Sequence, residues 1–370
     1  MKRVHGIIHA YHGYSELREL GSKRTGASMP FCGRYRLIDF PMSSLMNAGV
    51  TNVGIIMQKG YQSLLGHMGS GRAWNMERRT GGLTLLPPYG IADASSGVYV
   101  GCMDALNSVR SYLRDSINEP YVVLMRGDLC ANIDLEKAID RHVSTGVDIT
   151  AVCTSSPLSG VHHSYIVGKN GVAEQLLCLQ TENVGVQSLE TYIMSKDLLI
   201  EVVEWCAHRG CIHLHRDAIM HLMNEGKKIG IYMHDGYARM IKNVLDYYEA
   251  NMDMLDDKKR ALLFPPERNV TTRRSINVST YYGDEANVKN SLVADGCVVE
   301  GDVENCVLFP GVKLAAGSVL KNCIIMNDTV IGPNVELNCV IADKDVNVSS
   351  FVSLTGNPRL PLVIPNRSRI

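Results

Sequence analysis

VHGIIHAYHGYSELRELGSKRTGASMPFCGRYRLIDF, from Val4 to Phe40, is the segment around which the rest of the chain is organised. Its apolar start, Val4 to Tyr11, predicts a buried strand, because short continuous apolar runs are typical of strands with both faces covered. A loop follows, and after it come Arg24 and the segment from Pro30 to Phe40. This strand and its loop therefore begin the first domain of the chain.

Beyond this segment, strand-like and helix-like patterns alternate as far as about residue 255. Val53 to Met57, Tyr121 to Met125 and Asp148 to Cys153 are predicted strands, while Asp134 and Ser195 are predicted N-caps of helices that end at glycines. Such alternation favours a Rossmann-like, doubly wound and mostly parallel sheet. Ligands of such sheets bind beyond the carboxyl ends of the strands, where the loops after Tyr11, Gln58 and Met125 are expected to lie.

The pattern changes twice after residue 255. Residues 256–280 have no clear periodicity, and we interpret them as a linker. From residue 281 to 370 an internal repeat follows, in which short apolar segments alternate with Gly, Asn and Asp. Its asparagines recur at intervals of 15, 17 and 16 residues, at Asn290, Asn305, Asn322 and Asn338. This spacing predicts a β-helix of stacked turns, with an ordinary antiparallel sheet as the alternative.

Composition excludes several classes of protein. The formal net charge of −1 does not suggest a nucleic-acid-binding protein. No apolar run approaches the roughly 20 residues that span a bilayer, so we expect no membrane partner. The 11 cysteines are scattered without a CxxC pair, which favours reduced thiols in a cytoplasmic protein over a disulfide framework or a zinc site.

Several motifs resemble those of sugar-nucleotide pyrophosphorylases, most closely the ADP-glucose pyrophosphorylase (glucose-1-phosphate adenylyltransferase) family. Arg24 and Pro30–Phe40 match the second half of the family's GGxGxRLxxLTxxRAKPAxxFGGxxRxIDF motif. Gly127 and Asp128 match its G-D pair after a strand, and Tyr99–Ala105 resembles YRGTADA. The resemblance runs over nearly the whole chain.

This resemblance implies a fold and a reaction. The fold would be a Rossmann-like nucleotidyltransferase domain over residues 1–255, followed after the linker by a left-handed parallel β-helix. The reaction joins glucose 1-phosphate to the α-phosphate of ATP and releases pyrophosphate. It depends on positioning and on cationic stabilisation of the phosphoryl oxygens, with Mg²⁺ held by two aspartates.

The phosphate loop departs from the family motif at five positions. Tyr11 and His12 replace its paired glycines, and Tyr14 replaces its third glycine. Glu16 replaces its arginine, and Gly26 replaces the lysine of RAKP. A flexible backbone cradle for a triphosphate has therefore become bulky, and one cation has become an anion.

The metal and sugar-phosphate positions are altered as well. Asp128 keeps the first metal carboxylate, but Met240 replaces the second aspartate, and a thioether is a poor Mg²⁺ ligand. Lys242 stands where the family has a glycine and would place a cation near the metal position. Residues 170–195 contain no Lys or Arg to bind the sugar phosphate, and Glu190 replaces a glycine.

Other pocket positions are retained, namely Gln58, Gly101, Asp104 and Asp128. They would line a residual nucleotide pocket, or they would be kept because the helix that starts near Gly101 still packs. Asp128 would be a remnant of the metal site or only a cap.

His213 and His215 alternate on an expected strand beside Cys211, a pattern that a pair of metal ligands could share. No third and fourth ligands stand at a suitable spacing, so no bound metal is expected there.

Together these departures resemble the GlgD-type subunits of the family, and they imply a non-catalytic chain that modulates a catalytic homologue in glycogen synthesis. The resemblance implies a hetero-oligomer, expected to be a tetramer, in which the partner requires Mg²⁺ and this chain binds no cofactor tightly. An anionic effector would bind basic residues near both domains, the candidates being Arg24, Arg34, Arg36, Arg359, Arg367 and Arg369.

Two alternatives remain. One is an active sugar-phosphate nucleotidyltransferase with an atypical phosphate loop. The other is a β-helix scaffold or acyltransferase, which is disfavoured as an acyltransferase because no histidine follows His234 to act as a general base.

Overall fold

The computed structural model describes residues 4–10, 17–88, 99–274 and 276–370. A nine-stranded sheet forms the centre of the first domain, in the order β10-β9-β11-β6-β1-β4-β5, and β8 joins β11 to β12. The strands of this domain are β1 (Val4–Ala10), β2 (Pro30–Phe31), β3 (Tyr35–Arg36), β4 (Asn52–Met57), β5 (Leu83–Leu86), β6 (Tyr121–Arg126), β7 (Leu129–Ala131), β8 (Ile149–Thr154), β9 (His162–Val167), β10 (Ala173–Gln180), β11 (Val186–Ser195), β12 (Ile229–Met233) and β13 (Ala238–Met240).

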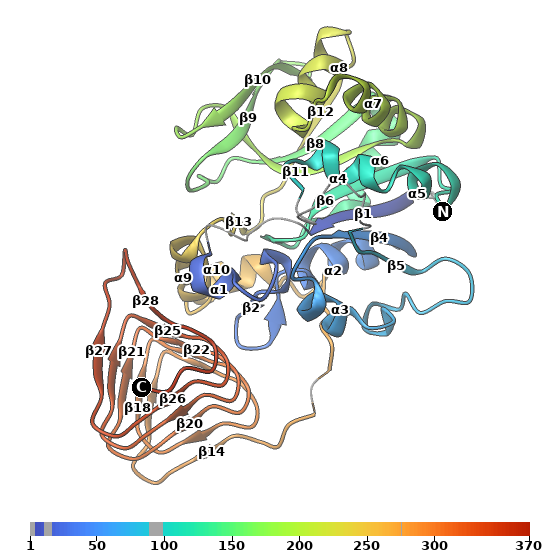
Figure 1. Ribbon diagram of the computed structural model, residues 1–370. Coiled ribbons are helices and arrows are strands. Elements are labelled where there is room, and N and C mark those ends of the chain that lie inside the picture. The colour runs from blue at the N-terminus through green and yellow to red at the C-terminus, as the bar shows by residue number, and fades with distance from the viewer. Residues whose placement is uncertain (1–3, 11–16, 89–98, 275) are drawn as a thin grey trace.

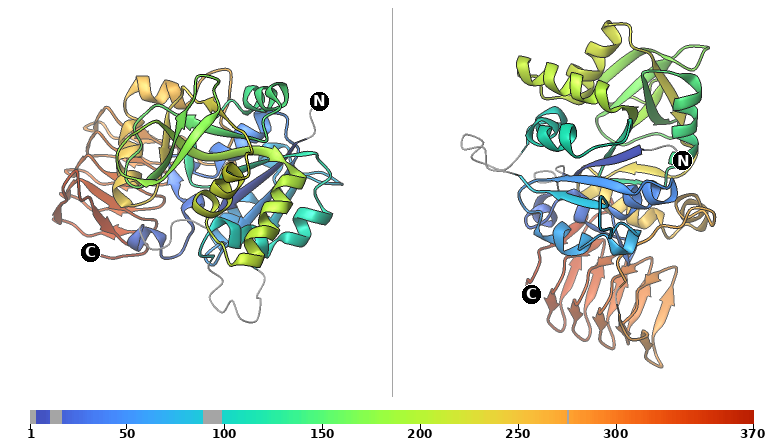
Figure 2. Two further views of the ribbon diagram at one scale, coloured as in Figure 1. Left: turned by 90° about the horizontal axis from the view of Figure 1, so that it is seen from above. Right: turned by 90° about the vertical axis from the view of Figure 1, so that its right-hand side faces the viewer.

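Helices cover both faces of this sheet (Figures 1 and 2). Ile7 and Ile8 of β1 point to opposite faces, each into its own apolar core, one closed by α4, α5 and α7 and the other by α2 and α6. The helices are α1 (Arg18–Gly21), α2 (Asp39–Asn47), α3 (Gln62–Met68), α4 (Cys102–Ser108), α5 (Arg110–Asp115), α6 (Leu135–Thr145), α7 (Lys196–Arg209), α8 (Met220–Asn224), α9 (Val244–Asp253) and α10 (Asp257–Leu263), with 3-10 turns at Gly26–Ser28 and Arg72–Trp74 and a π-helical turn at Leu214–Ile219.

The predicted caps are confirmed. The side chain of Asp134 accepts a hydrogen bond from the backbone N–H of Lys137 at the start of α6, and Ser195 does the same for Leu198 at the start of α7. Both helices end at a left-handed glycine, as expected. None of the described helices is long and apolar enough to cross a membrane.

The sheet is more mixed than the alternation of strands and helices suggested. β1, β4, β5 and β6 are parallel, but β11 runs antiparallel to β6, β8 and β9. The β9–β10 hairpin, rather than a helix, leads into β11, so no parallel crossover is formed there. The mixed α/β fold itself is confirmed.

The second domain is a parallel β-helix of three five-stranded sheets, as the repeat predicted. Asn290, Asn305, Asn322 and Asn338 form a ladder of side-chain hydrogen bonds up one corner. The three sheets are β14 (Tyr281–Tyr282), β17 (Val298–Val299), β20 (Lys313–Leu314), β23 (Val330–Ile331) and β26 (Asn347–Val348); β15 (Asn287–Lys289), β18 (Asp302–Glu304), β21 (Val319–Lys321), β24 (Glu336–Asn338) and β27 (Ser353–Thr355); and β16 (Leu292–Val293), β19 (Val307–Leu308), β22 (Ile324–Ile325), β25 (Val340–Ala342) and β28 (Leu362–Ile364).

Residues 256–280, expected to be a linker, begin with the helix α10. Asp256 caps α10, and Leu263 at the end of α10 is fully buried. The amide of Asn132 donates hydrogen bonds to the carbonyl oxygens of Leu263 and Arg268. A seven-residue helix with one buried apolar residue produces no visible periodicity, which is why the sequence did not predict it.

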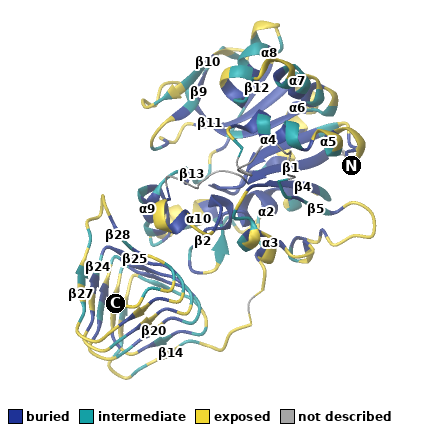
Figure 3. Ribbon diagram, in the orientation of Figure 1, coloured by how far each residue is buried: buried dark blue, intermediate teal, exposed yellow. Residues whose placement is uncertain are grey.

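The two domains share an apolar core. Figure 3 colours the strands of the central sheet, and parts of the β-helix strands, as buried. Phe40 and Tyr247 of the first domain and Phe309 and Met326 of the β-helix belong to the same buried cluster. Gly33, in the β2–β3 turn with φ of +70°, lies against the β-helix, where an added Cβ would be 3.4 Å from the carbonyl oxygen of Leu308. The segment that follows the phosphate loop, Pro30 to Phe40, therefore also forms part of the interface between the domains.

Candidate active site and domain interface

The candidate active site lies where β1, β4 and β6 end at their carboxyl edge. Four of the altered loop positions, Tyr11, His12, Tyr14 and Glu16, lie outside the described residues. The fifth, Gly26, is buried in the turn Gly26–Ser28.

Asp128 follows β6 and is held by the arginine two residues before it. The Nε and Nη2 atoms of Arg126 donate to the two carboxylate oxygens of Asp128 at 2.8 and 2.9 Å. The Nη1 atom of Arg126 donates to Glu190 at 3.0 Å. Arg126 is 5% and Asp128 2% exposed, so this network is buried.

The position of the family's second metal aspartate, here Met240, lies next to Asp128 and is apolar. β13 pairs with β7, which places Met240 opposite Leu129, the residue after Asp128. Met240 is 3% exposed and packs in an apolar core. Burial, followed by the charge of Arg126, lowers the pKa of Lys242, whose ammonium donates to the carbonyl oxygen of Val161.

These residues do not fit Mg²⁺. Both oxygens of Asp128 already accept from a guanidinium, and Met240 offers sulfur where a hard cation requires oxygen. Lys242 adds a second positive charge to this region, and the charges of Glu190 and Asp128 oppose the lowering of its pKa.

Glu190 adopts a backbone conformation that favours glycine. Its φ is +49°, at a register shift between Ser188 and Thr191 where β11 pairs with β8. Its backbone N–H donates to the hydroxyl of Ser188 at 3.1 Å. Such a conformation costs a non-glycine residue about 1–2 kcal/mol, so the surrounding contacts must hold it.

Two histidines lie beside Glu190. The rings of His163 and His215 stack with centroids 3.8 Å apart and planes 9° from parallel. His215 Nε2 is 2.6 Å from the hydroxyl of Tyr192. Burial lowers the pKa of His163 to about 4 and that of His215 to about 3, so both are neutral near pH 7.

Ligand atoms of His163, Glu190 and His215 lie within 4.8 Å of one another, close enough to consider a metal. A metal binds in the plane of an imidazole ring, however, and two stacked parallel rings cannot both place one ion in their planes. This arrangement therefore does not fit a shared ion.

The histidine pair proposed from sequence is organised differently. His213 precedes the π-helical turn Leu214–Ile219 rather than lying on a strand, so the expected alternation of His213 and His215 on a strand was wrong. Spacing alone could not reveal His163 as the neighbour of His215, because 52 residues separate them.

The retained pocket positions serve packing in two cases. A Cβ at Gly101 would collide with the carbonyl oxygen of Ile212, so glycine is needed for α4 to pack there. Asp104 accepts from the backbone N–H of Val100 at 3.2 Å. Gln58 is 1% exposed, and its Oε1 has no hydrogen-bond partner among the described residues, which leaves an acceptor at the end of β4.

Of the six candidate effector arginines, Arg24 and Arg36 lie close enough for the charge of Arg24 to lower the pKa of Arg36. Arg24 makes a buried ion pair with Asp343 of the β-helix, at 2.7 Å to both carboxylate oxygens. Arg36 donates to Ser63, whereas Arg34 is exposed. In the tail, Arg367 lies 3.8 Å from Asp345 and is exposed, as are Arg359 and Arg369.

Lys344 joins this region, and sequence reasoning missed it. Burial, then the charges of Arg36 and Arg24, lowers the pKa of Lys344 to about 8. Burial likewise lowers the pKa of Arg36 to about 10, with Asp39 opposing the shift and Arg24 and Arg273 adding to it. Arg24, Arg36 and Lys344 are hereafter the interface cations.

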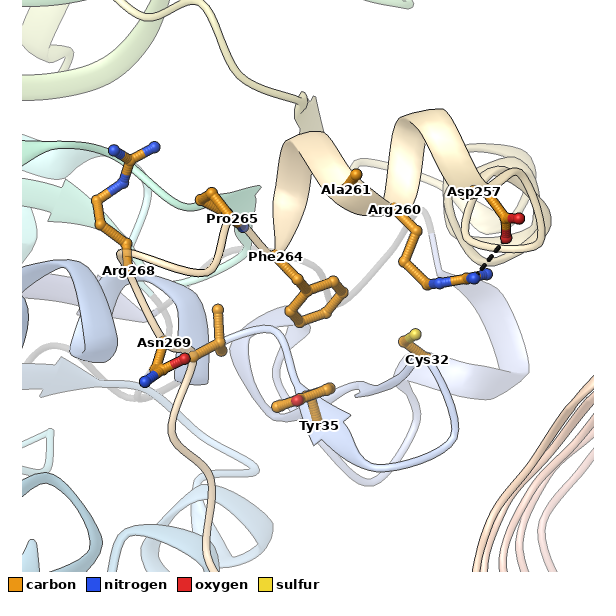
Figure 4. A pocket seen from close by; sticks show the side chains of 10 residues that line it. Cys32, Tyr35, Asp257, Arg260, Ala261, Phe264, Pro265, Arg268 and Asn269 are labelled. Carbon is orange, nitrogen blue, oxygen red and sulfur yellow. Dashed lines mark hydrogen bonds and ion pairs between the residues drawn. The ribbon is translucent and has the colours of Figure 1, made fainter.

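Several cavities lie elsewhere, and two of them contain arginines. One, of about 500 Å³, lies between the β2–β3 hairpin and α10, where Arg260 is paired with Asp257 above Tyr35 and Phe264 (Figure 4). Another, of about 810 Å³, lies between α1 and residues 355–363 and includes Arg18 and Arg359. Neither is lined by Asp128 or Glu190.

Two family models match different parts of this chain. The family described as "Nucleotidyl transferase" matches residues 14–162, and "GlmU-like, C-terminal hexapeptide" matches residues 277–359. The chain is 31% identical over 343 residues to proteins named glucose-1-phosphate adenylyltransferase from Bacillus thuringiensis (strain Al Hakam), Bacillus cereus (strain Q1) and Bacillus anthracis. These alignments cover 90% of this chain and 89% of each relative.

Proposed function

Because this chain belongs to the glucose-1-phosphate adenylyltransferase family, we propose that it is a non-catalytic, GlgD-type regulatory subunit of that enzyme. In this proposal it assembles with a catalytic homologue, as a heterotetramer, and modulates ADP-glucose synthesis for glycogen. Mg²⁺ and turnover belong to the partner.

The observation that carries this proposal is the state of the metal position. The family resemblance calls for two aspartates, but the second is a buried methionine, and the first is neutralised by a guanidinium. Without a divalent cation, charge that develops on the phosphoryl oxygens lacks its main stabilisation. The loop substitutions at Tyr11, His12, Tyr14 and Glu16 are also expected to weaken binding of the triphosphate.

The regulatory half of the proposal rests on the domain interface. Three interface cations, Arg24, Arg36 and Lys344, are opposed by Asp343 and Asp39. Burial is the main cause of the lowered pKa values of Arg36 and Lys344, and the charge of Arg24 lowers both further, whereas Asp343 and Asp345 oppose the shift of Lys344. We propose that an anionic effector is attracted there and biases the contact between domains.

Sulfate is a suitable probe of these cations because its own charge is constant between pH 7 and 9. Lys344 loses its proton as pH rises through its pKa of about 8, so sulfate affinity is expected to fall by about tenfold between pH 7 and pH 9. Titration calorimetry of the whole chain measures this fall.

Lys344→Met provides the control for the sulfate experiment. It is expected to bind sulfate weakly at pH 7 and to lose the pH dependence. A pH profile of sulfate binding that is unchanged in Lys344→Met would show that Lys344 is not part of the site.

The function itself is tested by ADP-glucose synthesis with three preparations: this chain alone, a catalytic homologue from the same cell alone, and the two co-expressed. We expect no turnover by this chain alone and a changed rate or effector response in the co-expressed complex. Substantial turnover by this chain alone, lost in Asp128→Ala, would instead support an active enzyme with a rebuilt phosphate loop.

A further inference from the structure

We propose that Arg126 is a resident cation that takes over the role of the divalent metal, holding Asp128 and Glu190 together so that this site binds no Mg²⁺. The inference deepens the proposed function and rests on it, since a catalytic chain would need the metal. It assigns a role to Arg126 and Glu190, for which the motifs alone gave none.

Three nitrogens of one guanidinium make the contacts. Nε and Nη2 form a bidentate pair with Asp128, at 2.8 and 2.9 Å, and Nη1 reaches Glu190 at 3.0 Å. Arginine suits this task because its planar fork matches a carboxylate and remains charged when buried. Side-chain exposures of 6% for Arg126, 2% for Asp128 and 12% for Glu190 place all three groups away from bulk water.

Glu190 is held in place at a cost. A glycine would adopt φ of +49° without strain, whereas glutamate does so at about 1–2 kcal/mol. The ion pair with Arg126 offsets that cost and gives the carboxylate a direction. The bulge in β11 therefore aims a second carboxylate at the guanidinium that already binds Asp128.

Charge balance explains why a divalent ion would be excluded. Among the described residues of this cluster, the carboxylates of Asp128 and Glu190 are balanced by Arg126 and Lys242. The neighbouring imidazoles of His163 and His215 are neutral near pH 7. A divalent cation would have to displace the guanidinium of Arg126 from a buried bidentate pair with Asp128, which is costly.

Removal of the guanidinium should therefore open a metal site. In Arg126→Met, Asp128 and Glu190 lose the guanidinium that joins them and Lys242 alone faces two carboxylates, and hard divalent ions prefer such oxygen ligands. Paramagnetic resonance of Mn²⁺, added alone to the full chain, measures binding without any assay of activity. We expect no specific Mn²⁺ binding by the wild type, and about one Mn²⁺ per chain in Arg126→Met.

Matched variants identify the ligands. Arg126→Met/Asp128→Asn is expected to lose the new Mn²⁺ site, and Arg114→Met, which breaks the exposed pair with Glu204, is expected to gain none. The proposal is overturned if folded Arg126→Met binds no more Mn²⁺ than the wild type.

A second measurement needs no arginine variant and so stands even if Arg126→Met does not fold. Wild-type protein that binds Mn²⁺, with binding abolished by Asp128→Asn, would overturn the proposal. Wild-type protein without such binding supports it. Either result is separate from the proposed function, because an inactive regulatory chain could still bind Mn²⁺ at Asp128.

Discussion

Arg126→Met is expected to lower the free energy of unfolding by about 3–5 kcal/mol, because removal of one partner from a buried ion network leaves uncompensated charge. Here two carboxylates, Asp128 and Glu190, lose the same guanidinium at once. Unfolding by urea, followed by circular dichroism in the absence of divalent ions, measures the loss.

Two control variants distinguish the effect of unpaired buried carboxylates from the effect of removing an arginine as such. Arg114→Met breaks a more exposed pair and is expected to cost only about 0–1 kcal/mol. Arg126→Met/Asp128→Asn removes one of the stranded charges and should recover part of the loss. A change below about 1 kcal/mol in Arg126→Met would contradict a tightly paired buried network.

Asp343→Ala is also expected to lower the free energy of unfolding by about 3–5 kcal/mol, because it removes a buried ion pair between the two domains. In the wild type, the guanidinium of Arg24 binds both carboxylate oxygens of Asp343 and is 5% exposed. The substitution therefore leaves a buried positive charge without this carboxylate. Because the pair joins the first domain to the β-helix, we expect the melting curve to broaden or split as the domains uncouple. Calorimetry of the whole chain measures both effects.

The adjacent aspartate provides a matched control. Asp345 is exposed and lies 3.8 Å from Arg367, so Asp345→Ala is expected to change stability by less than about 1 kcal/mol. Equal effects of Asp343→Ala and Asp345→Ala would show that the Arg24 pair does not stabilise the interface.

Local signals explain what the sequence predicted well. The caps at Asp134 and Ser195 and the glycines that end α6 and α7 depend on neighbours within one or two helical turns. The asparagine repeat likewise predicted the β-helix, because each turn repeats the same corner. Such patterns can be recognised from residues that are close together in the sequence.

Long-range pairing explains what the sequence missed. Arg24 and Asp343 are 319 residues apart, and Arg126 and Glu190 are 64 apart. Charged residues at those positions are equally compatible with an exposed surface, so only the fold shows which of them meet. Lys344 gave no signal because its neighbours Arg24 and Arg36 come from the other domain.

The substitutions in the phosphate loop remain predictions, because Tyr11, His12, Tyr14 and Glu16 lie outside the part of the chain that is described. Met240 and Asp128 are brought together by the β7–β13 pairing, which the sequence could indicate only through the family resemblance.

The most direct test of the proposal that this chain is non-catalytic assays ADP-glucose synthesis by a co-expressed complex in which the metal aspartates of the catalytic partner are replaced by asparagine. Any remaining turnover must then come from this chain, folded and assembled with its partner. We predict no synthesis above the background of the disabled partner alone. Synthesis that persists in the complex and disappears with Asp128→Asn in this chain would contradict the account.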